Sequence, residues 1–325
     1  MSHKGGSTVS AVRDWLDSAH RALVGHTDVL NDLNVFPVAD SDTGVNLSTT
    51  VGYATEAAQL IEGNDIGELL QYAGRAALEQ ARGNSGVLMA LTLTAMGTSL
   101  EGSTRVTAGQ LRDAFSAAQV RCWSALTDPV EGTLISVLEA VSKVSLPENS
   151  QDGSNQQLSD WMDLVVDRGS NAVIETVDQL PVLHERGTVD SGALGMLIVL
   201  VELRAALTGD LSRHNPVPDI IRDYSEHSGH SDNHSSVGFE VMCTVELSAL
   251  DAAELRHELD SAGDSVLVSA VNETDNGYTW RVHVHVEDPE EALTLMRARG
   301  QAVNVSVTSL GSDETQASDE PQVSP

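Results

Sequence analysis

The sequence is poor in lysine, in aromatic side chains and in cysteine. Of its 325 residues 18 are lysine or arginine, whereas 48 are aspartate or glutamate, and the formal net charge is -30. Proteins that bind nucleic acid through its phosphates need clustered basic residues. The composition therefore excludes nucleic acid and anionic membrane surfaces as expected partners. It also means that a bound phosphate group would need metal ions to neutralise the protein's own field.

Several common sequence signals are absent. There is no Walker A sequence and no G-x-G-x-x-G, which excludes standard P-loop enzymes and eukaryotic-type kinases. Two cysteines are too few for a disulfide framework. The opening stretch MSHKGGSTVS lacks the apolar region of a signal peptide, and the longest apolar runs are shorter than the ~18 residues of a membrane span. We therefore expect a cytoplasmic protein with no integral membrane segment.

Residues 1–208 are predicted to form an all-α domain. Aromatic residues make up 3% of the chain, so the core must consist mainly of Ala, Leu and Val, which suits helix-on-helix packing. Apolar residues recur at helical spacing, and Gly, Asp and Pro separate the segments. The pattern predicts eight helices, over Val9–Leu33, Val45–Ile61, Ile66–Gln80, Gly86–Leu100, Thr107–Ala125, Gly132–Val144, Gln157–Asp178 and Gly192–Leu207.

The composition changes after this domain. Residues 209–236 are rich in His, Ser and Asp and are predicted to be a linker. From 237 to 311 the apolar period changes from helical to alternating, and the order β-α-β-β-α-β predicts a small ferredoxin-like α+β domain. Residues 312–325 are polar, acidic and Pro-containing, and are predicted to be a disordered tail.

The densest chemical signal lies between the first two predicted helices, in the run from Asn34 to Asn46. Asp40 and Asp42 are two residues apart in a turn, so both carboxylates can reach one cation, and magnesium uses one or two protein carboxylates together with phosphate oxygens. The step Thr43-Gly44 then opens a helix, whose free N–H groups favour a phosphate. An Asp-rich helix cap is the alternative interpretation of this motif.

Three more polar, Gly-containing loops precede predicted helices. Taken alone, each is most simply a turn or a helix cap. Because consecutive helices alternate in direction, loops of the same parity can gather at one end of the domain, where Arg82 could reach a phosphate. The residues singled out in these loops are Arg82, Asn84, Ser85, Gly86, Gly132, Thr133 and Asp190.

These four segments together resemble a known family. "LNDLNVFPVADSDTGVNLSTT", "EQARGNSGVLMALTL", "DPVEGTLISVLEAV" and "VDSGALGML" are similar to the nucleotide-binding domain of bacterial fatty-acid kinases. They resemble the ADP-binding subunit of dihydroxyacetone kinase more distantly. The segments "FEVMCTVEL" and "WRVHVHVEDPEEALTLMRARG" resemble the middle domain of the fatty-acid kinases.

The resemblance implies an antiparallel eight-helix barrel that binds ATP at one end. It implies that Asp40 and Asp42 hold Mg²⁺ against the phosphates, with Asn34 at the place of a third aspartate in distant relatives. It further implies transfer of the γ-phosphate to the carboxylate of a fatty acid, held by a separate fatty-acid-binding protein. The nucleotide-side positions that it implies are Thr43, Gly44, Asn46, Asn84, Ser85, Gly86 and, less directly, Gly132, Thr133 and Asp190.

The sequence departs from the family in three respects. Ser41 replaces the usual Gly between the two aspartates, and Ala39 replaces the usual Pro before them. Longer family members carry a third domain, which this sequence lacks. The acceptor is therefore open, and a dihydroxyacetone (glycerone) kinase-type enzyme and a non-catalytic nucleotide-binding regulator remain alternatives. A homo-oligomer is possible in each case.

The second domain contains a pattern suited to zinc. His283 and His285 are two apart on a predicted strand, so their side chains share a face, and Cys243 lies on another predicted strand. A Cys-His-His set is a common zinc ligand set. The spacing alone is also that of the polar face of an amphipathic strand, whereas resemblance to the middle domain favours zinc.

Overall fold

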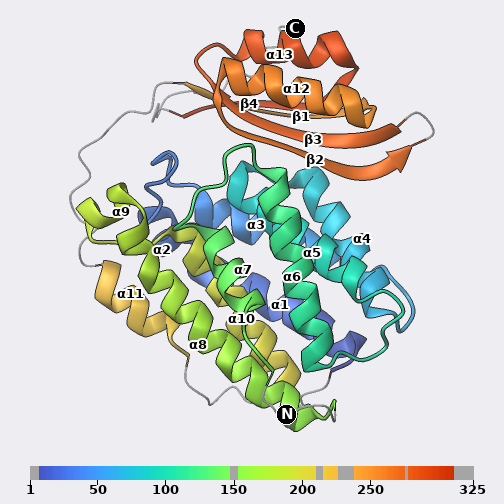
Figure 1. The fold of residues 1–325 in the computed structure, drawn as a ribbon, viewed down its shortest axis with the longest axis vertical. Helices are drawn as coiled ribbons and strands as arrows, with labels where there is room; N and C mark the ends of the chain where they lie inside the picture. Colours follow the sequence, from blue (N-terminus) through green and yellow to red (C-terminus); the bar gives the residue numbers. More distant parts are fainter. Residues whose placement is uncertain (1–6, 147–152, 210–214, 226–237, 275–276, 311–325) are drawn as a thin grey trace, which may run out of the picture.

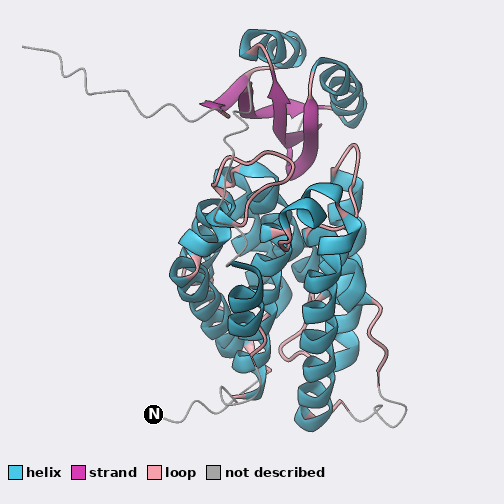
Figure 2. Cartoon of the chain, turned by 90° about the vertical axis from the view of Figure 1, so that its left-hand side faces the viewer, coloured by secondary structure: helices cyan, strands magenta, loops and turns pink. Residues whose placement is uncertain are grey.

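The structure of the chain, a computed structural model, describes residues 7–146, 153–209, 215–225, 238–274 and 277–310. A helical part comes first, and a four-stranded sheet with two helices follows it. The sheet lies across one end of the helical part, and its two helices cover the face that points away from that end (Figures 1 and 2). The prediction of a helical domain followed by a small α+β domain is confirmed.

Up to Thr208, the described residues form eight helices of nine or more residues, with two six-residue helices between them. Consecutive long helices pack side by side, and α10 returns to pack against α1. The more specific prediction of an antiparallel eight-helix barrel stays a prediction. The helices are α1 (Val9–Gly25), α2 (Thr27–Asp32), α3 (Thr43–Ala58), α4 (Ile66–Gln80), α5 (Gly83–Ser99), α6 (Ala108–Ala125), α7 (Leu134–Ser142), α8 (Asn155–Gln179), α9 (Pro181–Arg186) and α10 (Ser191–Thr208).

Seven of the eight predicted helical segments correspond to one helix each, with ends that differ by a few residues. The first segment is instead divided into α1 and α2, because His26 leaves the helical conformation with ψ near 9°. The short α9 was not predicted; it begins at Pro181, a residue that suits the first turn of a helix but gives no apolar periodicity. Helical spacing thus finds the long helices and misses single-turn ones.

Helix α10 is apolar on all sides. By length and composition it could cross a membrane, yet 78% of its apolar window is buried inside the protein. It packs against α1, α7 and α8, which is the position of a central core helix. It is the sole helix of this kind in the part of the chain that the structure describes.

Helix α11 (Val217–Ser225) lies within the stretch 209–236 that was predicted to be a linker. It buries Val217 and Ile220 and packs against α10 and α2. Part of the predicted linker is therefore attached to the helical domain by an amphipathic helix. Residues 210–214 and 226–236, and the predicted tail 312–325, lie outside the described residues.

The α+β domain has the strand order β2-β3-β1-β4 with antiparallel neighbours. Strands β1 and β2 both flank β3, so they run parallel to each other and are joined by α12, as in a split βαβ unit. The elements are β1 (Phe239–Leu247), α12 (Ala249–Ala262), β2 (Asp264–Thr274), β3 (Gly277–Val286), α13 (Pro289–Arg299) and β4 (Ala302–Ser309).

The two faces of this sheet have different partners. One face packs under α12 and α13 in a core of its own. The other face turns toward the helical part, where Met242, Leu267 and Val271 join the core of the helical domain. The two domains therefore share buried apolar surface, and the sheet is fixed against the ends of α4 and α6.

Candidate nucleotide and metal site

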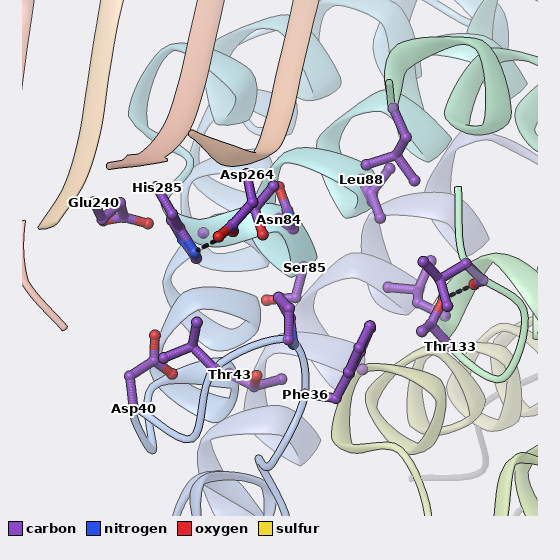
Figure 3. A pocket seen from close by; sticks show the side chains of 18 of the residues that line it. Phe36, Asp40, Thr43, Asn84, Ser85, Leu88, Thr133, Glu240, Asp264 and His285 are labelled. Atoms are coloured by element: carbon purple, nitrogen blue, oxygen red, sulfur yellow. Dashed lines mark hydrogen bonds and ion pairs between the residues drawn. The ribbon is translucent and has the colours of Figure 1, made fainter. Parts of the chain in front are cut away.

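A cavity of about 460 Å³ lies where the helix ends meet the sheet. Figure 3 shows its side chains arriving from the helical domain on one side and from the strands on the other. The four sequence segments are separated by up to 150 residues, yet the structure brings residues of all of them to this cavity. The predicted residues that line it are Asn34, Asp40, Asp42, Thr43, Asn46, Asn84, Ser85, Thr133 and Asp190.

Asp40 and Asp42 lie at the cavity, in the loop before α3. Ser41 between them has φ 55°, which is a left-handed conformation. Glycine, the usual residue here in the family that the sequence resembles, can adopt this conformation without strain. Asn34 Nδ2 donates to Asp40 Oδ1 at 2.5 Å. Burial and the neighbouring Asp42 charge raise the pKa of Asp40 to about 7, and burial also raises the pKa of Asp42. Two desolvated carboxylates this close favour a cation between them.

Two side-chain amides beside this pair have buried atoms without hydrogen-bond partners. These atoms are Asn46 Nδ2, a donor, which lies near Asp42 without reaching it at hydrogen-bond distance, and Asn84 Oδ1, an acceptor. Asn46 is buried at the first turn of α3, and Asn84 lies at the start of α5. Buried polar atoms in folded proteins are normally paired, so an unpaired donor and acceptor lining one cavity indicate a polar ligand.

Gly83 makes the approach of these two segments possible. Its φ is 59°, and a Cβ at this position would lie 2.5 Å from Asn46 Nδ2. Only glycine combines this backbone conformation with so close a neighbour. The start of α5 is thereby held against the start of α3, at the edge of the cavity.

Asp190 is a buried N-cap at the far side of the cavity. Its carboxylate accepts a hydrogen bond from the Ala193 amide at 2.7 Å, at the start of α10. Burial raises its pKa to about 7, against the lowering effect of hydrogen bonds from backbone amides that include Leu134 at the start of α7. The carboxylate thus caps α10 and lies close to the start of α7.

Four predicted residues do not line the cavity. Arg82 is the exposed N-cap residue of α5, and Gly86 instead allows close packing of α5 on Thr50 of α3. The Gly44 amide is already bonded to Asn31 Oδ1 at 2.8 Å, and the Gly132 amide to Ser136 Oγ at 2.8 Å. These amides are satisfied within the protein. The roles proposed for the four residues toward a nucleotide stay predictions.

The α+β domain contributes three cavity residues that the sequence analysis missed, namely Glu240, Asp260 and Asp264, together with His285, which was predicted as a zinc ligand and not as part of this cavity. The only sequence signal for Glu240 is an acidic residue inside an apolar strand, and nothing in the sequence indicates that this strand faces the helical domain. Among the described residues no lysine or arginine lines the cavity, whereas seven acidic residues do. A polyanionic ligand therefore needs cations to enter it.

The predicted Cys243-His283-His285 set is wrong in one member. In β1, Cys243 is paired with Val282, so its side chain lies on the other face of the sheet, 3.3 Å from Met296 Sδ and buried under the helices. Residues on the face of His283 are those of even number in β1. Burial raises the pKa of the Cys243 thiol to about 11, which also disfavours the thiolate that binds metals.

Glu240 takes the place that was predicted for the cysteine. The ligand atoms of Glu240, His283 and His285 lie within 4.8 Å of one another, and all three residues are buried. His283 Nε2 is 3.1 Å from Glu240 Oε1, and His283 Nδ1 is 3.0 Å from the Ser265 carbonyl. Burial, and next the neighbouring His283, lower the pKa of His285 to about 3 and keep it neutral. Two imidazoles and a carboxylate suit zinc.

Comparison with known families gives two matches along the chain. Residues 37–205 match the model of the DAK2 domain, and residues 236–317 match that of the FakA-like middle domain of fatty acid kinase. The fold and site thus define a kinase-related protein with a helical domain and an α+β domain. The chain belongs to the DAK2 domain family, with the middle domain typical of fatty acid kinases.

Several curated relatives match over most of this chain. An uncharacterized protein of Staphylococcus epidermidis is 28% identical over 91% of this chain and 54% of its own length. An uncharacterized protein of Staphylococcus aureus is 27% identical over 91% and 54%, and one of Staphylococcus saprophyticus is 28% identical over 89% and 52%. The chain spans about half the length of the curated relatives it matches.

Proposed function

We propose that the chain is an ATP- and Mg²⁺-dependent phosphotransferase that phosphorylates the carboxylate of a fatty acid. The observation that carries the proposal is the half-buried pair Asp40 and Asp42, beside unpaired amide atoms, in a cavity without a lysine or arginine among its described residues. This set matches what Mg²⁺ with a nucleoside triphosphate requires: carboxylate oxygens for the cation and uncharged polar groups for the phosphates. The family assignment supports the same conclusion.

In this proposal Asp40 and Asp42 would hold magnesium, which supplies charge neutralisation when bound. Asn34 keeps the Asp40 carboxylate oriented through its 2.5 Å hydrogen bond. Asn46 Nδ2 is positioned to donate to a phosphate oxygen, and Asn84 Oδ1 accepts from a ligand hydroxyl, amine or water. A carboxylate acceptor is already nucleophilic, so no protein base is needed. This fits the cavity lining among the described residues, which has no lysine, no arginine and no Asp-His pair beside the two aspartates that could act as a general base.

We further propose that Glu240, His283 and His285 hold a structural Zn²⁺ between the sheet and the nucleotide loops. The three side chains are convergent and buried, and the Ser265 carbonyl fixes the ring of His283. The metal is expected to tie β1 and β3 together at the cavity. It would also neutralise the buried Glu240 carboxylate, whose charge acts on Asp42.

The acyl acceptor is proposed to arrive on a separate binding protein. The core residues of the helical domain are used in helix packing. The cavity at the domain boundary combines acidic and polar groups with apolar side chains such as Phe36, Leu88 and Val266. We place the protein in the cytoplasm and divide it into an ATP-binding domain over 1–208 and a middle domain over 237–311.

The experiment is a titration of the protein with Mg²⁺-ATP, followed by an acyl-phosphate assay with candidate lipid-binding proteins. Micromolar binding that requires Mg²⁺, with an acyl phosphate formed in the presence of one partner, is the expected result. Phosphorylation of free dihydroxyacetone with no acyl product would favour a glycerone kinase-type enzyme. Binding of Mg²⁺-ATP without turnover toward any acceptor would favour a nucleotide-binding regulator.

A further inference from the structure

Two segments that line the cavity are held by the α+β domain in addition to the helical domain to which they belong. The first is the loop 81–86, which joins α4 to α5 and includes the first turn of α5. The second is the segment Leu126–Val130, which follows α6. Both are attached to the sheet through main-chain groups, which fixes their backbone rather than a single side chain.

The first attachment is made by Arg281 of β3. Its side chain is buried and its Nη2 donates to the Ala81 carbonyl at 3.0 Å. Its other partners are the weaker acceptors Thr244 Oγ1 at 3.4 Å and Met242 Sδ at 3.8 Å, its Nε has none, and none of the ion pairs in the described part of the chain includes this guanidinium. Burying a guanidinium with so few partners costs free energy of folding. We therefore take the contact with Ala81 to be the role of Arg281.

The loop is held from both sides. Two residues after Ala81, the Gly83 amide lies near Glu240 of the neighbouring strand β1, where, against the effect of burial, it adds to His283 in lowering the pKa of the carboxyl group. Across the loop, Gly83 lies against Asn46 of α3. The Ala81 carbonyl is thus fixed by β3 and Gly83 by its close approach to α3, and Asn84 and Ser85 follow directly into the cavity.

The second attachment is made by Arg256 of α12 and by the edge of β2. Arg256 Nη2 donates to the Ala125 carbonyl at 2.7 Å and to Val268 of β2 at 3.0 Å, and thereby ties the end of α6 to the sheet. Leu126 forms a β-bridge with Leu267, and the Thr127 amide donates to the Val266 carbonyl at 3.2 Å. The free edge of β2 is therefore used to hold the cavity wall.

We propose that the α+β domain is the positioning element of the nucleotide cavity: Arg281 sets the loop 81–86, and Arg256 sets the segment 126–130. The inference rests on the proposed function for the identity of the ligand, and on the contacts alone for the positioning. Neither arginine lines the cavity, so both act through the backbone of the residues that do. Loosening either contact should weaken nucleotide binding while both domains stay folded.

The test uses the full chain with Arg281→Met and Arg256→Met, which keep most of the apolar side-chain volume and remove the donors. The matched control is Arg297→Met, on the outer helix α13, where the arginine is exposed and 3.6 Å from Glu290. Hydrogen exchange is measured without nucleotide. We expect faster exchange at 81–86 in Arg281→Met and at 126–130 in Arg256→Met, with the other segment little changed in each case and neither changed in the control.

Mg²⁺-ATP affinity is then measured on the same proteins by calorimetry. Each of the two variants should bind about tenfold more weakly, the size expected when one hydrogen bond from a charged donor is lost. Arg281→Lys keeps a positive donor and should recover part of both the exchange protection and the affinity. If Arg281→Met does not fold, Arg281→Lys carries the test, with a smaller rise in exchange confined to 81–86.

The two proposals can fail separately. The wild-type protein could bind no Mg²⁺-ATP while each arginine variant still shows faster exchange in its own segment. That result would overturn the proposed function and leave the positioning role standing. Unchanged exchange in both segments, or a uniform rise across the helical domain in both variants, would overturn the positioning role even if Mg²⁺-ATP binds.

Discussion

Asn34 Nδ2 donates to Asp40 Oδ1 across 2.5 Å, and both residues line the same cavity. The amide satisfies one oxygen of a carboxylate that burial has largely removed from water. Asn34 therefore orients Asp40, and the remaining oxygens of Asp40 and Asp42 are the groups left for a cation. This assigns Asn34 a supporting position beside the pair, where the sequence analysis treated it as a possible magnesium ligand.

Asp40→Asn and Asp42→Asn should each abolish Mg²⁺-ATP binding and any phosphate transfer. Removal of one carboxylate deprives a small ligand set of half its charge, while the helices depend on apolar packing elsewhere. Calorimetric titration and circular dichroism measure the two effects. Asp113→Asn, at an exposed position on α6, is the control and should bind as the wild type does. Wild-type affinity in both cavity variants would contradict the assignment.

Stability should depend on pH through Asp190. The folded protein holds its proton with a pKa of about 7, against 3.8 for an unperturbed carboxyl group. Because the folded state binds this proton more tightly than the unfolded chain, the free energy of unfolding falls as pH rises through this window, by up to about 1.4 kcal/mol per unit.

Asp190→Asn removes this titration and keeps a residue suited to cap α10. Urea unfolding should show similar stability for variant and wild type near about pH 5, and a variant that is more stable near about pH 8 by up to about 3 kcal/mol. Asp40 and Asp42 titrate in both proteins and cancel in the difference. A difference between the two proteins that does not change with pH would show that the wild-type carboxyl group titrates normally.

Gly83→Ala should weaken nucleotide binding more than a comparable change elsewhere. The new Cβ would lie 2.5 Å from Asn46 Nδ2 and would push the start of α5 away from α3. Gly102→Ala is the matched control, because Gly102 also has a positive φ, of 76°, but nothing lies within 4 Å of the added Cβ. Both variants should lose about 1 kcal/mol of stability through backbone strain. Only Gly83→Ala should lose Mg²⁺-ATP affinity by calorimetry, and equal affinities would contradict the close-approach argument.

The long helices could be predicted from the sequence because their burial is one-sided or complete over many turns. Seven segments were located within a few residues, and the loop containing Asp40 and Asp42 was recognised from its two spaced carboxylates. The polar loops could be grouped at one end because helix direction alternates along the chain. These inferences need only local periodicity and chain order.

The contribution of the second domain could not be predicted in the same way. Strand register decides which residues of β1 share a face with His283, and the pairing of Met242 with His283 places Cys243 on the opposite face. The orientation of the sheet on the helical domain likewise decides that Glu240 and Asp264 reach the cavity. Both depend on contacts between residues far apart in the sequence, for which a single sequence carries no signal.

The proposed metal centre makes a prediction that separates Glu240 from Cys243. Protein purified without chelators should contain one zinc per chain, lost in His283→Ala and His285→Ala and weakened in Glu240→Gln. Cys243→Ser should keep the metal, because its side chain lies in the other core, although a hydroxyl buried there should lower stability by about 1–3 kcal/mol. Elemental analysis measures the metal. Zinc lost from Cys243→Ser but retained in Glu240→Gln would contradict the strand register.

The acceptor prediction concerns the protein together with a partner. Alone, the chain should hydrolyse ATP slowly and leave free fatty acid unmodified, because a carboxylate in water is not oriented at the cavity and orientation is much of what such a site supplies. A separate lipid-binding protein that presents the acyl carboxylate should give acyl phosphate. With a net charge of -30 the chain should dock a basic surface of that partner, so phosphate transfer to the partner-bound acyl chain should weaken as salt is raised.

The assay measures acyl phosphate with and without the partner at low and high salt. ATP hydrolysis by the chain alone serves as the control for salt effects on the cavity. Equal acyl phosphate formation from free fatty acid, or coupling that strengthens with salt, would contradict this prediction.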